Sequence, residues 1–146
     1  MRANGWVGWS GNARVGVSFG KLWLMGLEGT AWTDKREPGN VQPIKLDVTD
    51  QQQIDAAVET ITKAGRGLYG LVNNAGVAKS SIKAEEMSDE IWRFHLDVNL
   101  DGVFWCCRAF GKTMLQQCKG AIVNIGSMSG CISNKPQEQA AYNASK

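Results

Sequence analysis

Beyond residue 40, the apolar positions follow two periods, one typical of strands and one typical of helices. Short apolar runs at 68–72 and 121–125 predict strands, the second of them a buried parallel strand. An alternating run at 41–46 predicts an edge strand, because Pro43 cannot donate a backbone hydrogen bond. Apolar residues at helical spacing predict helices over about 50–64 and 88–115. This alternation predicts an α/β fold, a doubly wound parallel sheet with helices on both faces.

Both predicted helices have recognisable ends and one apolar face. Thr49 or Asp50 caps the first helix, and Gly65 ends it. Ser88 caps the second helix, and Gly120 ends it. The first apolar face is predicted to comprise Ile54, Ala57, Val58 and Ile61, and the second Ile91, Phe94, Val98, Trp105, Ala109 and Phe110.

The composition is that of an ordinary globular protein, with 146 residues, 43% hydrophobic and 21% charged. A net charge of +2 without a basic block argues against nucleic acid or a membrane surface as a partner. No apolar run reaches the ~20 residues that span a bilayer. The cysteines, Cys106, Cys107, Cys118 and Cys131, form no Cys-x-x-Cys pair, so we expect reduced thiols in a cytoplasmic protein and no metal site. The only histidine, His95, is expected to be a packed or surface residue rather than a catalyst.

Polar motifs accompany these elements. Asn73-Asn74-Ala75-Gly76 follows one apolar run, Ile125-Gly126-Ser127 ends another, and Asp97-Val98-Asn99 lies inside the long predicted helix. Parallel strands bind ligands at their carboxyl ends, where small residues let the backbone approach a cofactor closely. Tyr142 and Lys146 are four residues apart, so one helix face would bring the phenol beside the ammonium. That ammonium would lower the phenol pKa from its usual ~10 and make Tyr142 a general acid/base, although a chance surface pair has the same spacing.

In this order the motifs resemble the short-chain dehydrogenase/reductase family, whose catalytic tetrad is Asn, Ser, Tyr and Lys. The resemblance covers about Val41 to Lys146 and implies a Rossmann-like domain that binds NAD or NADP. It implies that Asn99 disturbs its helix and holds a water connecting to Lys146, and that Ser127 orients the substrate oxygen. Tyr142 would transfer the proton, while Lys146 would lower the Tyr142 pKa and hold the nicotinamide ribose.

The resemblance also implies residues that bind cofactor and substrate. The cofactor would contact Tyr142, Lys146, Asp47, Val48, Asn74, Ala75 and Gly76, with Asp47 and Val48 at the adenine ring. The segments 126–130, 134–139 and 142–143 are similar to those of mannitol and galactitol dehydrogenases. We therefore expect Ser127, Ser129 and Asn134 to bind the hydroxyls of a polyol.

Residues 1–40 depart from this pattern. They hold four of the six Trp and eight of the seventeen Gly, and they show neither helical nor strand periodicity. The family's glycine-rich phosphate turn is approached only by Gly16–Leu22, where Leu22 replaces the third glycine. Only 31 residues separate Gly16 from Asp47, whereas two helices, a strand and their loops need about 45. We interpret 1–40 as an atypical segment without a phosphate loop, a replaced or mistranslated start, and 41–146 as the central part of the domain.

The expected function is hydride transfer between NAD(P) and a polyol or its ketose. A 3-oxoacyl thioester or another carbonyl compound is the alternative substrate, and a non-catalytic fragment or interaction module is the alternative class. Family members continue beyond the position of Lys146, so we expect this chain to be an inactive fragment as it stands. In the complete protein, Trp92, Phe104 and Trp105 would give the 88–115 helix enough apolar surface to form a homo-oligomer.

Overall fold

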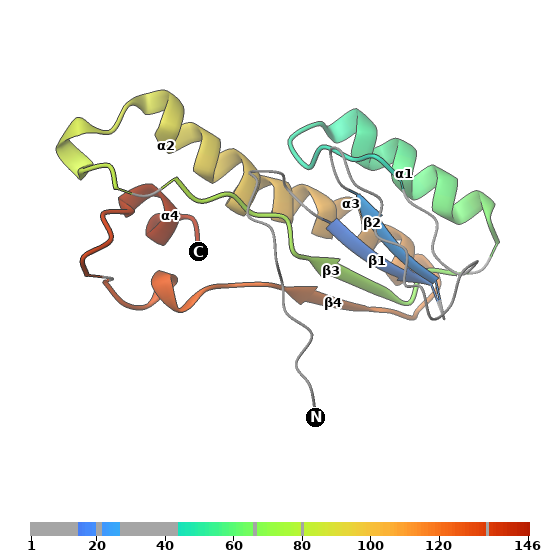
Figure 1. Cartoon of the computed structure of the whole chain (residues 1–146). Helices are drawn as coiled ribbons and strands as arrows, with labels where there is room; N and C mark the ends of the chain where they lie inside the picture. Colours follow the sequence, from blue (N-terminus) through green and yellow to red (C-terminus); the bar gives the residue numbers. More distant parts are fainter. Residues whose placement is uncertain (1–14, 20–21, 27–43, 66, 80, 134) are drawn as a thin grey trace, which may run out of the picture.

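The computed structural model describes residues 15–19, 22–26, 44–65, 67–79, 81–133 and 135–146. Within these ranges, four strands form one sheet in the order β2-β1-β3-β4. The strands are β1 (Val15–Phe19), β2 (Leu22–Gly26), β3 (Gly70–Asn73) and β4 (Ala121–Asn124). Figure 1 shows the sheet towards one end of the molecule, and the C-terminal helix α4 (Ala140–Ala144) beside α2 (Asp89–Leu96) at the other.

The sheet is mixed rather than wholly parallel. β3 and β4 are parallel, from the pair Gly70 and Ala121 to the pair Asn73 and Asn124. β1 runs antiparallel to both β2 and β3. Residues 1–40, which are interpreted from the sequence as having no strand periodicity, therefore contain the strands β1 and β2, and that interpretation is wrong at β1. A period-two signal was present, because Val15, Val17 and Phe19 alternate with Gly16 and Ser18.

The edge strand predicted at 41–46 is wrong for its described part, since Ile44–Leu46 forms no strand. Residues 41–43 lie outside the described ranges. A strand needs a hydrogen-bonding neighbour, and the edge of β3 away from β4 is taken by β1. Leu46 and Val48 are instead buried in the core.

The first predicted helix is present as α1 (Gln51–Lys63). Of the two candidate caps, Asp50 is the one used, because its Oδ1 accepts hydrogen bonds from the N–H groups of Gln52 at 2.9 Å and Gln53 at 3.2 Å. Ile54, Ala57 and Ile61 form its buried face. Gly65 follows the C-cap with a φ of 68°, a conformation that favours glycine.

The second predicted helix is continuous but irregular. Its parts are α2, a π-helical turn (Asp97–Asp101) and α3 (Gly102–Gln116). Ser88 caps it as predicted. Its buried face comprises His95, Val98, Asn99, Gly102, Cys106, Phe110 and Met114.

The predicted apolar face of this helix is therefore partly wrong. Val98 and Phe110 are buried, whereas Phe94 is exposed and Ile91, Trp105 and Ala109 are only half-buried. Polar His95 and Asn99 and small Gly102 occupy the inner side, and a count of apolar residues cannot detect them. His95 is packed, with Nε2 accepting from the Lys79 N–H at 2.9 Å and Nδ1 donating to the Ile91 carbonyl at 2.8 Å.

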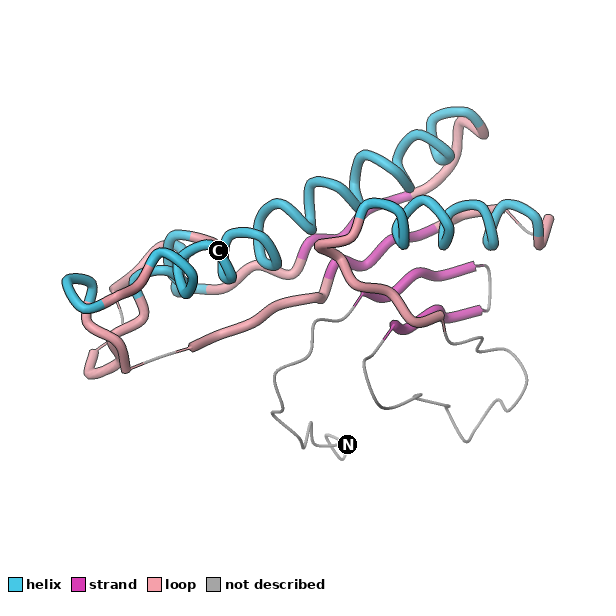
Figure 2. Tube along the Cα trace, turned by 90° about the horizontal axis from the view of Figure 1, so that it is seen from above, coloured by secondary structure: helices cyan, strands magenta, loops and turns pink. Residues whose placement is uncertain are grey.

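The core lies where α1 and α3 meet β3. Ile54, Leu71 and Phe110 are among its fully buried side chains. Arg108 Nη2 on α3 donates to Gln51 Oε1 on α1 at 2.9 Å, so the two helices lie side by side, as Figure 2 also shows. Short 3-10 turns, Ala84–Glu86 and Met128–Gly130, interrupt the connections that follow β3 and β4.

β4 is parallel as predicted, but the prediction that it is buried is wrong. Ile122 is 39% and Val123 50% exposed. β4 is the last strand of the described sheet, and among the described residues only its edge towards β3 is paired. Within the described ranges, no helix combines the length and the apolar character that crossing a membrane requires.

Candidate active site

The carboxyl ends of β3 and β4 lie next to each other. The Ile125 N–H donates to the Asn73 carbonyl at 2.9 Å and holds the two chains together where they leave the sheet. Asn73 is 2% exposed, and its Nδ2 donates to Asn124 Oδ1 at 2.8 Å. The end of β3 is thus tied to its neighbour by an asparagine side chain. Ligands of parallel sheets bind at this edge.

Asn99 fastens the chain that follows β3. It is 4% exposed and lies in the π-helical turn. Its Oδ1 accepts from the Val77 N–H at 2.8 Å, and its Nδ2 donates to the Val77 carbonyl at 2.9 Å. The helix is therefore irregular at the residue where the resemblance implies a disturbance, and the side chain reaches the residue after Gly76.

The other amide hydrogen of Asn99 reaches α4. Asn99 Nδ2 donates to Ser145 Oγ at 2.8 Å, and Ser145 Oγ donates to the Tyr142 carbonyl at 2.9 Å. Ser145 is 4% exposed. The sequence did not identify Ser145 as part of the site, although it lies one helical turn after Tyr142 and immediately before Lys146.

Lys146 lies between the two strand ends. Its Nζ donates to the Ile125 carbonyl at 3.2 Å. A Cβ added at Gly76 would lie 3.3 Å from Lys146 Nζ and 3.4 Å from Asn99 Oδ1, so the missing side chain of Gly76 leaves room for both groups. Burial lowers the pKa of the Lys146 ammonium from its ordinary value. The site thus holds a partly desolvated cation.

Tyr142 is half-buried on α4, which ends at Ala144 with Ser145 as its C-cap. Lys146 therefore lies just beyond the helix rather than within it. Gly130 packs against this end, because a Cβ there would lie 2.7 Å from the Lys146 carbonyl oxygen. The segment after Ser127 is thus in direct contact with the main chain of Lys146.

The two candidate serines differ in accessibility. Ser127 is half-buried, and its Oγ accepts from the Ser129 N–H at 3.2 Å. Ser129 is 6% exposed, and its Oγ accepts from Gln139 Nε2 at 3.3 Å. Asn134, the third candidate for substrate binding, lies outside the described residues.

The candidate adenine residues lie just before α1. Val48 is 1% exposed, and a Cβ added at Gly102 would lie 2.8 Å from its Cγ2, so its side chain faces the long helix rather than a ligand. Asp47 is exposed, and its Oδ1 accepts from the N–H of Thr49 at 2.9 Å and from the Thr49 hydroxyl at 2.8 Å. Among the residues with described side chains, no three His, Cys, Asp or Glu gather into a metal site.

This arrangement can be compared with known proteins. The family model for short chain dehydrogenases matches residues 25–146. The chain belongs to this family. The match begins 16 residues before Val41, where the resemblance of the sequence begins.

Two curated relatives and one solved structure illustrate the similarity. The galactitol 2-dehydrogenase of Rhizobium johnstonii is 53% identical over 100 residues, which are 68% of this chain and 39% of that protein. The 3-oxoacyl-[acyl-carrier-protein] reductase FabG of Thermotoga maritima is 38% identical over 109 residues, 75% of this chain and 43% of that protein. The structure of ElxO with NADP bound matches with a TM-score of 0.68 at 30% identity, over 73% of this chain and 42% of that one. The chain thus spans about two fifths of the length of these relatives.

Proposed function

We propose that this chain carries the catalytic segment of an NAD- or NADP-dependent oxidoreductase that interconverts a polyol and its ketose. The observation that carries the proposal is the convergence of Lys146, Asn99 and Gly76 at the ends of two parallel strands. The substrate class follows the 53% identity to a galactitol 2-dehydrogenase. The four cysteines are free thiols, which suits a reducing cytoplasm.

The residues around Gly76 fit the nicotinamide end of the cofactor. Gly76 presents bare backbone beside the Lys146 ammonium, and Asn74 and Ala75 precede it at the end of β3. Lys146 would hold the ribose hydroxyls, and the 74–76 backbone would pack against the ring. The bound cofactor would supply the hydride acceptor for oxidation and the donor for reduction.

β1 and β2 do not form a binding site for the pyrophosphate part of the cofactor. Gly16 lies within β1, and β1 is followed by the strand β2 rather than by a helix. A pyrophosphate site of this fold uses a glycine turn and a helix N-terminus. The fit therefore covers the nicotinamide half of the cofactor only.

The side chains have distinct roles in this proposal. In oxidation, the substrate hydroxyl gives its proton to Tyr142. The hydrogen on the carbon that bears this hydroxyl leaves as hydride, so the alcohol becomes a ketone. Tyr142 would act as the general acid/base that takes the hydroxyl proton, and Lys146, whose Nζ donates to the Ile125 carbonyl at 3.2 Å, would hold the cofactor ribose beside it. Ser127 Oγ, the more accessible of the two serines, holds the substrate oxygen. Both side-chain amide hydrogens of Asn99 already form hydrogen bonds, with the Val77 carbonyl and Ser145 Oγ. A relay water would therefore bind the side-chain or the main-chain carbonyl oxygen of Asn99.

A 3-oxoacyl thioester is the second candidate substrate, because FabG of Thermotoga maritima is 38% identical over a similar stretch. A chimera tests both substrates and the non-catalytic alternative. Residues 44–146 would replace the matching segment of the Rhizobium galactitol 2-dehydrogenase, and NAD(P)H absorbance would be followed with galactitol and with a 3-oxoacyl thioester. We expect galactitol turnover, with a larger loss in kcat for Ser127→Ala than for Ser129→Ala. A folded chimera that prefers the thioester, or turns over neither compound, contradicts the proposal.

We also propose that the complete protein is a homo-oligomer paired through the long helix. Trp92, Leu100 and Phe104 leave large apolar side chains exposed along it, Leu100 by 51% and Phe104 by 58%. Short-chain dehydrogenase interfaces of this kind would bury them. Light scattering measures the molar mass of the chimera and so tests whether it is an oligomer. Phe104→Glu should shift the chimera from oligomer towards monomer.

A further inference from the structure

The chain that follows Gly76 is held by two polar side chains of the long helix. Asn99 Oδ1 accepts from the Val77 N–H at 2.8 Å, and His95 Nε2 accepts from the Lys79 N–H at 2.9 Å. Four residues of an α-helix rise about 6 Å, and two residues of extended chain span about 6.6 Å. The helix therefore presents two acceptors at the spacing of alternate N–H groups in the segment 77–79.

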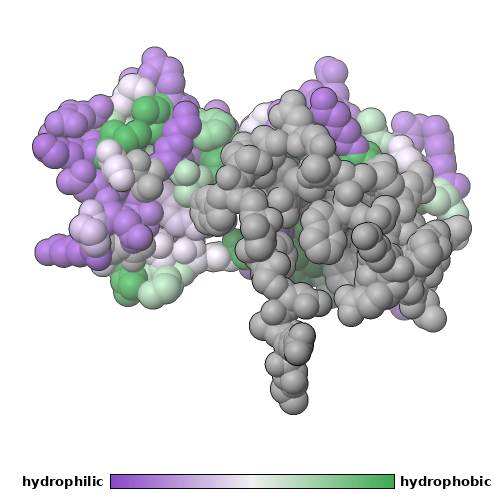
Figure 3. All heavy atoms as spheres, viewed as in Figure 1, coloured by the Kyte–Doolittle hydropathy of each residue, from purple (hydrophilic) through white to green (hydrophobic). Residues whose placement is uncertain are grey.

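His95 is a polar group in the interior. It is 0% exposed, although hydrophilic side chains cover much of the end of the molecule that holds α2, on the face that Figure 3 shows. Within the described residues, its ring bonds only to the Lys79 N–H and the Ile91 carbonyl. An N–H can only donate and a carbonyl can only accept, so the ring is neutral, with its hydrogen on Nδ1 and a lone pair on Nε2. The bond to Lys79 exists only in this protonation state.

The groups around the imidazole offer no carboxylate to a protonated ring. Lys79 Nζ lies 4.9 Å from the centroid of the Phe94 ring, which packs edge-on against the imidazole at 5.9 Å. α4 packs against α2 and brings one titratable side chain, Tyr142. On the long helix, Arg93 and Asp97 are two residues away and point to other sides. A second ring proton would thus break the Lys79 bond and gain no ion pair in exchange.

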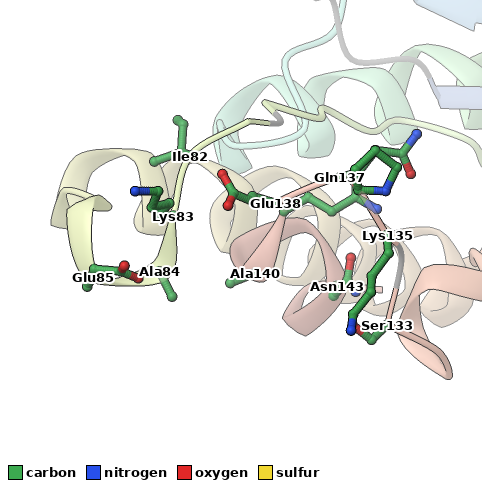
Figure 4. A pocket seen from close by; sticks show the side chains of 12 residues that line it. Ile82, Lys83, Ala84, Glu85, Ser133, Lys135, Gln137, Glu138, Ala140 and Asn143 are labelled. Atoms are coloured by element: carbon green, nitrogen blue, oxygen red, sulfur yellow. The ribbon is translucent and has the colours of Figure 1, made fainter.

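Both flanks of the segment are anchored independently of His95. Asn99 bonds to the N–H and to the carbonyl of Val77. On the other side, the Ile82 N–H donates to the Glu138 carbonyl at 3.2 Å, and both residues line a pocket of about 570 Å³ (Figure 4). Loss of the Lys79 bond would therefore loosen the chain between these two anchors and leave the core intact.

We propose that His95 is a pH-sensitive positioning residue for the turn 74–76. Its neutral imidazole holds Lys79 and so fixes the chain three residues after Gly76, beside which Lys146 Nζ lies. A second proton, taken up from solvent at Nε2, replaces the accepting lone pair by an N–H and releases the Lys79 N–H. The consequence for cofactor binding rests on the proposed function, whereas the His95–Lys79 bond does not.

The first test is NMR of the purified, ¹⁵N-labelled 146-residue chain and needs no substitution. His95 is the only histidine, so its ring nitrogens give the only imidazole signals. At a pH of about 8 we expect a hydrogen on Nδ1 and none on Nε2. As the pH is lowered towards about 5, Nε2 should gain a proton. The amide signals of Gly76 and Lys79 should shift with the same midpoint, while that of Leu71 in the core should not.

The second test compares two substitutions on the same helix. His95→Gln keeps an oxygen that can accept from the Lys79 N–H but takes up no proton. Arg93→Gln adds the same side chain at an exposed position and is the matched control. In the chimera, acidification through the midpoint should weaken NAD(P)H binding, followed by its fluorescence, about tenfold for the parent and for Arg93→Gln. For His95→Gln, binding should stay nearly constant.

Several results would overturn this inference. A hydrogen on Nε2 at a pH of about 8, or a Lys79 signal that does not follow the ring, shows that the imidazole does not hold the segment. A midpoint shared by Leu71 shows that acid unfolds the whole chain. Equal pH profiles of NAD(P)H binding for the parent and His95→Gln contradict positioning of the turn. An inactive chimera with the expected NMR and binding results removes the proposed function alone.

Discussion

Asn99 Nδ2 and Ser145 Oγ form a 2.8 Å hydrogen bond across 46 residues of sequence. Through it the π-helical turn is joined to the carbonyl of Tyr142, and through Val77 the same amide is joined to the turn after β3. Three elements that carry candidate catalytic or cofactor-binding residues are therefore held by one side chain. Its position sets where Tyr142 and Lys146 lie relative to Gly76.

Ser145→Ala should lower the free energy of unfolding by about 1–3 kcal/mol, because it leaves a buried Asn99 hydrogen without an acceptor. Urea denaturation of the 146-residue chain measures this. Ser133→Ala removes an exposed hydroxyl and should change stability by less than about 0.5 kcal/mol. Equal effects of the two substitutions would show that the Asn99–Ser145 bond does not hold α4 in place.

Motifs and periodicity predicted more of the framework than of the site's internal contacts. The candidate tetrad, α1 and the parallel pair β3 and β4 could be proposed because residue type and spacing carry their signal. Ser145 could not, since a buried serine on a helix matches no apolar period. The hydrogen bonds of His95 and Asn99 were missed for the same reason, and the segment at 44–46 failed because strand pairing depends on which neighbour takes the edge of β3.

Gly102→Ala should destabilise the chain by about 1–2 kcal/mol. The added carbon would lie 2.8 Å from Val48 Cγ2 and 3.2 Å from the Val48 carbonyl oxygen, and such overpacking outweighs the better helix propensity of alanine. Gly111→Ala on the same helix is the control, because its nearest neighbour, Ile122 Cδ1, would be 3.7 Å away. Thermal unfolding should show a loss for the first and a gain of up to about 1 kcal/mol for the second. A gain for both would mean that α3 is not in tight contact with Val48.

Cys106 should resist alkylation in the folded chain. Burial, and secondarily the neighbouring Cys107, raises the pKa of the Cys106 thiol to about 12, so almost no thiolate forms at mildly alkaline pH. Cys118 and Cys131 are exposed and should react quickly with iodoacetamide. Mass spectrometry of the labelled chain, before and after unfolding in urea, measures each site. Equal labelling of Cys106 and Cys131 in the folded chain would contradict the buried position of Cys106.

Lys146 should make stability rise with pH in the alkaline range. Its folded-state pKa is lowered from 10.5 by burial, so between the two values the unfolded chain binds more protons than the folded chain. The cost of burying the ammonium applies in full below the lowered pKa, falls as pH rises above it, and is gone only above the unfolded-state pKa of 10.5. Urea midpoints measured from neutral pH towards 10.5 should therefore rise for the wild type relative to Lys146→Met. If the urea midpoints of the two chains changed with pH in parallel, the Lys146 ammonium would be solvent-exposed in the folded chain.

The most direct test of the proposed function is the turnover of galactitol by the chimera with Tyr142→Phe. A general acid/base contributes about 10²–10⁴-fold, so loss of the phenol hydroxyl should lower kcat by at least about a hundredfold. Binding of NAD(P)H, followed by its fluorescence, should stay nearly unchanged, because the ring and Lys146 remain. A variant that keeps more than about a hundredth of the parent kcat would contradict proton transfer by Tyr142.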